Sequence, residues 1–448
     1  MENLFKNHGI TEKDIAAQRA IDEKAREEAW DKLRHSLECE LEDSVKAADT
    51  TDALRDMYAL FDEGTSEWYY GLYDAECGGF YYANSSRDNP QFLPDLESTY
   101  QAFGFIATMT EDRNLKAYLP LWMQERLVQW VRGLQRENGF FYHPQWKTED
   151  TDAHPPRRGR DLSHATGLLR QFGGEPKYLT PVSAKKDSEE RFVPEHFSTK
   201  EKLLEYISSL DINGKPYSVG NNLESQATQF LARDGDLEKM GADYRVTDII
   251  YDWLCKAQNP RTGLWTPYDE IDYEGTNGLL KVSGAICRMN KPVPNVLAAL
   301  RSAKIGITEL GHSTQVCGVM NPWYTITNLT ANVRRFGLGG STLEAERAVK
   351  AFRWELLSDM PHLIRHTTAE MRRFRKADGS FSYNEARTVT CSQGMPVSLG
   401  LNEGDVNATH VMRSTVGHVM SVIGNGTVPS VGLSDLMRFI SVAEAAKK

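Results

Sequence analysis

The sequence lacks any long apolar stretch. No run of about 18 uncharged apolar residues occurs in its 448 residues, and the beginning, MENLFKNHGITEKD, has neither a basic segment nor an apolar one of the kind that signal peptides carry. With 40% hydrophobic and 25% charged residues, the composition is that of a globular protein. We therefore expect a soluble, cytoplasmic protein without a membrane span.

Paired cysteines and an excess of positive charge are also missing. The six cysteines form no Cys-x-x-Cys pair, so neither a zinc ribbon nor a disulfide framework is indicated. The net charge of -10 opposes attraction to phosphate backbones, and the one dense basic run, Arg157, Arg158 and Arg160, is short. We expect no nucleic-acid partner, no metal and no cofactor.

Strand patterns are scarce, and helical patterns dominate. Residues 11–47 are expected to form one or two amphipathic helices, with an apolar row at every fourth position (Ile21, Ala25, Ala29, Leu33 and Leu37). We interpret residues 1–50 as a helical extension through which the protein could form oligomers, and residues 51–448 as one large domain. The segment from Gly173 to Lys200, rich in proline and charge, is predicted to be a loop.

A weak repeat runs along the large domain. In four segments an apolar helix end is followed by a glycine and then an aromatic residue; the pairs are Gly78 and Phe80, Gly139 and Phe140, Gly263 and Trp265, and Gly379 and Phe381. Glycine can take a positive φ after a helix, so each segment is predicted to turn the chain back. After each turn a new helix is expected to begin at an acidic or amide residue, at Asp95, Asp161, Asn222, Asp272 or Asp405. A further copy fits near Asn321, giving about six helical hairpins.

These segments resemble a known superfamily. The hairpin ends are similar to the Gln-x-x-x-Gly-x-Trp/Phe motifs of squalene-hopene-type cyclases, and the helix starts resemble those of terpenoid cyclases and protein prenyltransferase β subunits. The resemblance spans roughly residues 65–430 and implies an all-α fold, an (α/α)6 toroid with a central cavity.

The sequence departs from that superfamily in its chemistry. Neither the Asp-x-Asp-Asp acid of triterpene cyclases nor an Asp-Asp-x-x-Asp magnesium motif occurs. Cys391, Asp405 and His410 are the nearest counterparts of the prenyltransferase zinc ligands, but Cys391 lies in a glycine-rich loop and no spacing pairs it with the other two.

If the ring closes, the starts of the inner helices bring a set of carboxylates to one mouth of the cavity. Paired acids of this kind could protonate a glycosidic oxygen and activate water. We expect Glu97 and Glu274 to form that pair, with Asp95 and Asp272 as second candidates, because helix capping already accounts for the aspartates. Glu224, Asn277 and Asp405 are expected to bind substrate at the same mouth.

Aromatic residues near the turns are the second conspicuous set. A sugar stacks its C–H faces on such rings, so substrate contacts are expected from Tyr82, Phe141, Tyr142, Trp265, Tyr268, Trp323 and Tyr324. The alternative is that these rings only pack one repeat against the next.

Elimination from a uronic acid would need a histidine or tyrosine base and a cation that neutralises the carboxylate. His143, near the arginines 157, 158 and 160 in sequence, and His410, near Arg413, are the candidates.

The leading hypothesis is therefore an enzyme that hydrolyses or eliminates a carbohydrate in the toroid cavity, with an oligosaccharide or another small molecule as its substrate. Two alternatives stay open: a terpene-cyclase-like or prenyl-transferring enzyme, and a non-catalytic helical scaffold.

Overall fold

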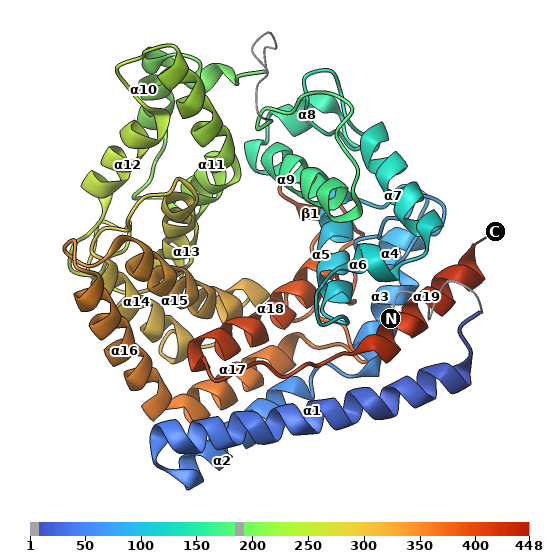
Figure 1. Ribbon diagram of the computed structural model, residues 1–448. Coiled ribbons are helices and arrows are strands. Elements are labelled where there is room, and N and C mark those ends of the chain that lie inside the picture. Colours follow the sequence, from blue (N-terminus) through green and yellow to red (C-terminus); the bar gives the residue numbers. More distant parts are fainter. Residues whose placement is uncertain (1–8, 184–191, 448) are drawn as a thin grey trace.

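The computed structural model describes residues 9–183 and 192–447, and it is mostly helical (Figure 1). Its helices are α1 (Glu12–Leu41), α2 (Ser44–Tyr58), α3 (Glu63–Gly71), α4 (Asn84–Arg87), α5 (Leu96–Ala107), α6 (Leu115–Tyr118), α7 (Leu121–Gly133), α8 (Thr148–Asp152), α9 (Pro155–Phe172), η1 (Glu195–Phe197), α10 (Lys200–Ser208), α11 (Pro216–Lys239), α12 (Val246–Ala257), α13 (Tyr273–Arg288), α14 (Val296–Thr308), α15 (Val316–Phe336), α16 (Thr342–Ser358), α17 (Met360–Phe374), α18 (Val406–Ile423) and α19 (Leu433–Ala446). Strands β1 (Cys391–Ser392) and β2 (Met395–Pro396) form an antiparallel hairpin.

Six of these helices follow one another around a closed cycle of contacts. In chain order α5, α9, α11, α13, α15 and α18 each contact the next, and α18 contacts α5. Figure 1 shows these six helices around a common centre, with α7, α10, α12, α14 and α16 farther out. The prediction that helix dominates is confirmed.

The repeated glycines occupy turns that only glycine fits. Gly78, Gly139, Gly263 and Gly379 all have φ between 70° and 86°. A Cβ on Gly263 would lie 2.4 Å from the backbone of Ala299 in α14, and one on Gly379 would lie 2.4 Å from the backbone of Thr65 in α3. The aromatic residue after each turn is completely buried, as Phe80 and Phe381 are. The turns at Gly78, Gly263 and Gly379 therefore pack directly against the backbone of α7, α14 and α3.

The expected helix starts are correct at three places. Asp95, Asp272 and Asp405 are the N-caps of α5, α13 and α18, each accepting a hydrogen bond from a backbone N–H of the first turn.

At the other starts the expectation is wrong. Helix α9 begins at Pro155 and α11 at Pro216, because a proline fixes φ in the first turn and needs no N–H partner there. Asp161 therefore lies in the second turn of α9, and Asn222 lies well inside α11. The faint copy near Asn321 corresponds to α15, which begins five residues earlier, at Val316.

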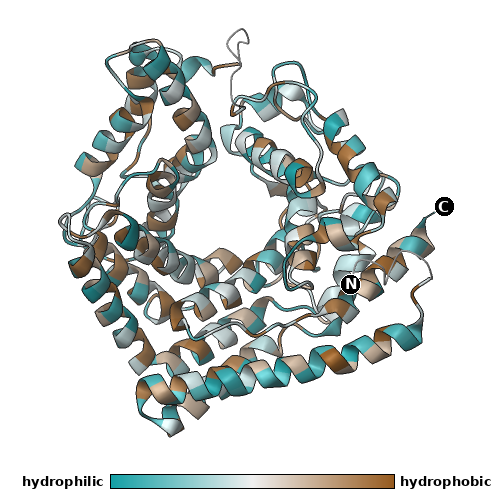
Figure 2. Ribbon diagram, in the orientation of Figure 1, coloured by the Kyte–Doolittle hydropathy of each residue, from teal (hydrophilic) through white to brown (hydrophobic). Residues whose placement is uncertain are grey.

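Residues 11–47 form two helices, as the sequence allowed. The Thr11 side chain caps α1, which ends where Glu42 takes a φ of 53°, and Asp43 caps α2. The predicted apolar row is correct only near its end, because Ile21 is 61% exposed and Trp30 is buried instead, alongside Leu33 and Leu37. Helix α1 packs on α2 and α19, and α2 continues past residue 50 to pack on α17. Figure 2 shows hydrophilic residues interleaved with fewer hydrophobic ones along α1.

The predicted loop from Gly173 to Lys200 contains the short η1 and, at its last residue, the start of α10; residues 184–191 lie outside the described residues. Across residues 9–183 and 192–447, no helix combines the length and apolar character needed to span a bilayer.

Candidate functional site

A cavity of about 370 Å³ opens at the centre of the helix cycle, and every one of its six helices contributes to the lining. Its polar lining residues include Gln101 of α5, Arg160 and His164 of α9, Tyr217, Asn221 and Glu224 of α11, Lys281 and Arg288 of α13, Cys317, Asn321 and Tyr324 of α15, and Asn407 and His410 of α18. Tyr383 and Gln393, from the segment between α17 and α18, complete the wall.

Two arginines of α9 dominate the electrostatics on one side of the central cavity. Arg157 is fully buried and donates to Glu97 Oε2 at 2.8 Å and to Asp161 Oδ1 at 2.6 Å. Arg160 donates to Glu97 Oε1 at 2.7 Å and to Asn221 Oδ1 at 3.2 Å, and it faces the cavity. Burial alone would raise the pKa of Glu97, but the two guanidinium groups outweigh it and hold that pKa well below its usual range. Glu97 is therefore an ionised anchor for the arginines.

Two histidines stay uncharged at the same cavity. Burial lowers the pKa of His164 to about 3 and that of His410 to about 4, so both imidazoles are neutral at pH 7. The His164 ring is stacked on Tyr100 at 4.6 Å, and within the described chain its Nδ1 has no hydrogen-bond partner. His164 follows Arg160 by four residues, so the two side chains share one face of α9.

Residues of α11, α13 and α15 and of the segment between α17 and α18 add an ion cluster and tyrosine hydroxyls to the lining. Glu224 pairs with Lys281 at 2.9 Å and with Arg288 at 3.2 Å. Within the described residues it is the one carboxylate of the cavity lining. Burial raises the pKa of Tyr217, so its hydroxyl keeps its proton at neutral pH. The Tyr383 hydroxyl lies 3.3 Å from the thiol of Cys317.

The β1–β2 hairpin covers part of this arrangement. Ser392 donates to Glu97 Oε2 at 2.9 Å, and Gln393 accepts from Asn221 Nδ2 at 2.9 Å. The two residues of the tight turn, Gln393 and Gly394, have φ of 49° and 85°. Met395 and Val397 are buried with Tyr82 and Trp146, which fixes the hairpin at its base.

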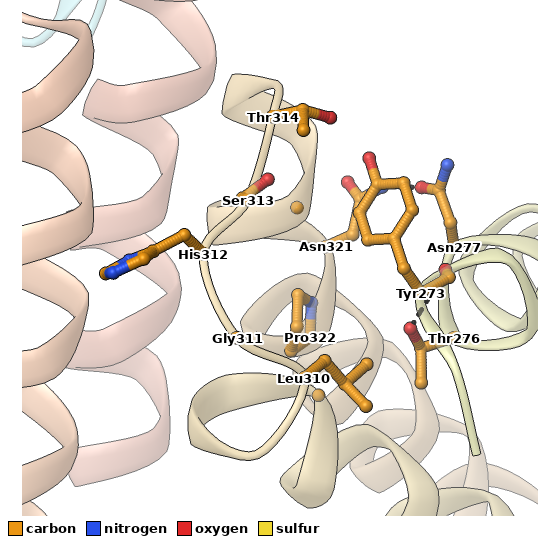
Figure 3. A pocket seen from close by; sticks show the side chains of 12 residues that line it. Tyr273, Thr276, Asn277, Leu310, Gly311, His312, Ser313, Thr314, Asn321 and Pro322 are labelled. Carbon is orange, nitrogen blue, oxygen red and sulfur yellow. Dashed lines mark hydrogen bonds between the residues drawn. The ribbon is translucent and has the colours of Figure 1, made fainter. Parts of the chain in front are cut away.

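A second, smaller cavity of about 180 Å³ lies beside the first and shares Asn321 with it. Tyr273, Asn277 and Asn321 face one another there, and the loop that carries Ser313 and Thr314 forms the rim (Figure 3). Asn321 donates to the amide oxygen of Asn277.

The structure does not bring the predicted acids together at the central cavity. Glu97 is buried beneath the arginines, whereas Glu274 is exposed in the first turn of α13 and outside the cavity lining. Asp95 and Asp272 act as helix caps, and the Asp272 carboxylate also accepts from the Tyr268 hydroxyl at 2.9 Å. Asp405 accepts three hydrogen bonds, and burial raises its pKa to about 6.

Among the other predicted residues, Glu224, His410 and Tyr324 line the central cavity, and Asn277 lines the smaller one. His143 is buried with Nε2 2.8 Å from the Pro94 carbonyl oxygen. Arg413 lies outside both linings, with its guanidinium 5.9 Å from the centre of the Phe61 ring.

Most of the predicted aromatic residues lie in the packing between helices. Phe141, Trp265 and Trp323 are completely buried, and the two indoles donate to Leu254 and Thr367. Tyr82 and Tyr142 are buried too, while Tyr268 is 42% exposed. Only Tyr324, stacked on His418 at 4.5 Å, is part of the central wall.

Sequence reasoning missed the polar stripe of α11 and the hairpin residue Gln393. The stripe was detectable, because Tyr217, Asn221, Glu224 and Thr228 recur at intervals of three or four residues within one helix. The sequence around Gln393 has no comparable periodic pattern, because its contact with Asn221 of α11 arises only from tertiary folding. No group of three or more histidine, cysteine or acidic residues in the described ranges could hold a metal ion.

The fold and cavity thus define a mostly helical protein with a polar, charged cavity inside a closed cycle of six helices. No family model matches the sequence, and no curated protein matches it. A solved structure described as a protein from Actinoplanes is similar over 84% of this chain and 99% of its own length, with 14% sequence identity and a TM-score of 0.38.

Proposed function

We propose that the protein is an (α/α)6 toroid enzyme that binds an acidic carbohydrate in the central cavity and cleaves it by β-elimination. The cycle of contacts among α5, α9, α11, α13, α15 and α18 supports the toroid assignment. The observation that carries the proposed chemistry is the neutral His164 beside the cationic Arg160 on one face of α9, both lining a polar cavity.

Elimination from a uronic acid has three requirements. A base removes the proton from the carbon next to the carboxylate, a cation stabilises the negative charge that develops there, and an acid protonates the departing glycosidic oxygen. The electron pair of the broken C–H bond forms the new C=C bond as the C–O bond breaks, so no oxidant or metal is needed.

Residues of the cavity match these three roles. The His164 imidazole accepts the proton, the Arg160 guanidinium faces the carboxylate, and the Tyr217 hydroxyl protonates the leaving oxygen. Arg160 and Tyr217 line the same cavity, from neighbouring helices α9 and α11. Asn221, bonded to Arg160, holds the guanidinium in position.

The other functions considered for this sequence receive less support. Hydrolysis by the pair Glu97 and Glu274 is disfavoured because Glu97 is held ionised and Glu274 is exposed outside the cavity. An isoprenoid substrate would need a mainly apolar pocket, whereas charged and amide side chains line this one.

The test is incubation with polymers of glucuronate, galacturonate and mannuronate and with neutral glucans, followed by ultraviolet absorbance of the unsaturated product. We expect product from at least one uronate polymer, and a rate at least about a hundredfold lower for a folded His164→Gln variant, because loss of a general base typically costs that much. New reducing ends without absorbance would show hydrolysis instead. No product from any uronate polymer would refute the proposal.

A further inference from the structure

The smaller cavity beside the central one has the properties of a second binding site. It lies between the start of α13, the end of α14 and the loop that precedes α15, and Asn321 belongs to its lining as well as to that of the central cavity. Asn321 is thus the one lining residue that the two cavities share among the described residues.

We infer that the two cavities are neighbouring subsites for one oligosaccharide: the central cavity takes the acidic unit, and the smaller cavity takes an uncharged, hydroxyl-bearing sugar unit. This inference rests on the proposed function. It adds that the substrate has at least two sugar units and that the second one is neutral.

Unused hydrogen-bonding groups in the smaller cavity support this assignment. The Tyr273 hydroxyl is buried without a hydrogen-bond partner in the described parts of the chain. The one bond between Asn321 and Asn277 leaves the Asn277 amide hydrogens and the Asn321 amide oxygen available to a ligand. Figure 3 shows these three side chains directed toward one another. A sugar hydroxyl can donate and accept at once, so it matches such a mixed set.

The two cavities differ in the charge of their linings, and this difference determines which kind of sugar unit each one suits. Arg160, Lys281 and Arg288 line the central cavity. In the smaller one, the only ionisable lining groups within the described ranges are Tyr273 and His312. The His312 ring points away from Tyr273 and Asn321 and bonds to Glu370 at 2.5 Å. A carboxylate would find no cation there, whereas a neutral sugar unit would not need one.

The test compares the binding of glucuronate with that of glucosyl-glucuronate, a disaccharide with one neutral unit, by titration calorimetry on the full chain. We expect the disaccharide to bind wild-type protein about tenfold more tightly, the gain expected from one or two additional hydrogen bonds. Thr314→Trp, at the exposed rim of the smaller cavity, should abolish this gain and leave glucuronate binding unchanged. Thr342→Trp, on the exposed surface of α16, is the matched control and should keep the gain.

The outcomes separate this inference from the proposed function. If wild-type protein binds glucuronate but gains nothing from the second unit, or if Thr314→Trp keeps the gain, the subsite is refuted and the central site stands. If neither compound binds, the inference is refuted, and the proposed function is then judged by the product assay on all three uronate polymers.

Discussion

At the scale of single residues, Arg157 is the buried cation on which two carboxylates depend. It is inaccessible to solvent, and it bonds to Glu97 from α5 and to Asp161 one turn later in α9. Charges so deeply buried are costly to leave unpaired, because no water replaces the lost partner. The helix cycle thus holds an ion cluster that links two neighbouring inner helices.

Replacement of Arg157 should be strongly destabilising. We expect Arg157→Leu to lower the free energy of unfolding by about 3–5 kcal/mol, since Glu97 and Asp161 lose their shared partner. Arg19→Leu is the control, because Arg19 and Glu63 pair at 2.8 Å with side chains that are 42% and 58% exposed, and it should cost less than about 1 kcal/mol. Urea unfolding followed by circular dichroism measures both variants. Equal effects would contradict the role of the buried cluster.

His410 makes stability depend on pH. Burial lowers its pKa in the folded protein from 6.5 to about 4, although Glu97 acts in the opposite direction. Between pH 6.5 and pH 4, His410 is protonated in the unfolded chain but neutral in the folded protein. The free energy of unfolding therefore declines as the pH falls toward 4. We expect this residue alone to cost about 2 kcal/mol between pH 7 and pH 5.

The His410→Gln variant isolates that effect. The difference in unfolding free energy between the variant and wild-type protein should move by that amount in favour of the variant when the pH is lowered from 7 to 5. Urea titrations at the two pH values give the comparison. A difference that stays constant with pH would rule out a neutral buried imidazole.

At the scale of elements, caps fix where the helices begin. Asp405 caps α18 with a 2.7 Å bond from the Ala408 N–H and also accepts from the Tyr383 N–H and the Thr388 hydroxyl, all without solvent exposure. Asp43 caps α2 with one 2.9 Å bond at an exposed position. Asp405 therefore accepts more hydrogen bonds than Asp43, and it does so in a buried position.

We expect Asp405→Ala to lower the unfolding free energy by about 3 kcal/mol, because it leaves buried donors without an acceptor in addition to removing a cap. Asp43→Ala should cost about 1 kcal/mol, the usual effect of an exposed cap. Thermal and urea unfolding of both variants are the measurements. If the two variants lose similar amounts of unfolding free energy, burial does not increase the contribution of the Asp405 cap to stability.

Elements that depend on local chemistry were predictable from the sequence. Gly379 followed by Phe381 predicts a turn because few residues other than glycine take a positive φ, and Asp405 predicts a helix start because its side chain accepts from the free N–H groups that follow it. The starts of α9 and α11 were missed because Pro155 and Pro216 compete with the polar residues farther along.

The candidate site was less predictable than the helices. Glu97 was predicted to be catalytic from its position alone, but its partners Arg157 and Arg160 come from the next inner helix and hold its carboxylate ionised. A pKa depends on such tertiary neighbours, and no local pattern contains them. The predicted substrate contacts of the aromatic residues met the same difficulty. An aromatic side chain such as Trp265 can pack one repeat against the next as readily as it can bind a sugar, and Trp265 is completely buried.

At the scale of the whole molecule, α1 joins the two ends of the chain. It packs on α2 near the start and on α19 near the end. Glu40 of α1 pairs with Arg353 of α16, and Asn425 donates to Ser36 at 3.0 Å. Trp30, Leu33 and Leu37 are buried in the same core cluster as side chains of α11, α15 and α18. The buried face of α1 thus belongs to the same hydrophobic core as the helix cycle.

A substitution in α1 should therefore destabilise the entire protein. We expect Leu37→Ala to lower the unfolding free energy by about 2–5 kcal/mol and to shift one cooperative transition, because its side chain is completely buried. Ile21→Ala, on the exposed face of the same helix, should change it by no more than about 0.5 kcal/mol. Hydrogen exchange resolves the question: slowly exchanging amides in α18 should lose protection in Leu37→Ala together with those of α1. If only the amides of α1 lose protection, the helix is an independent appendage, and the ring is stable without it.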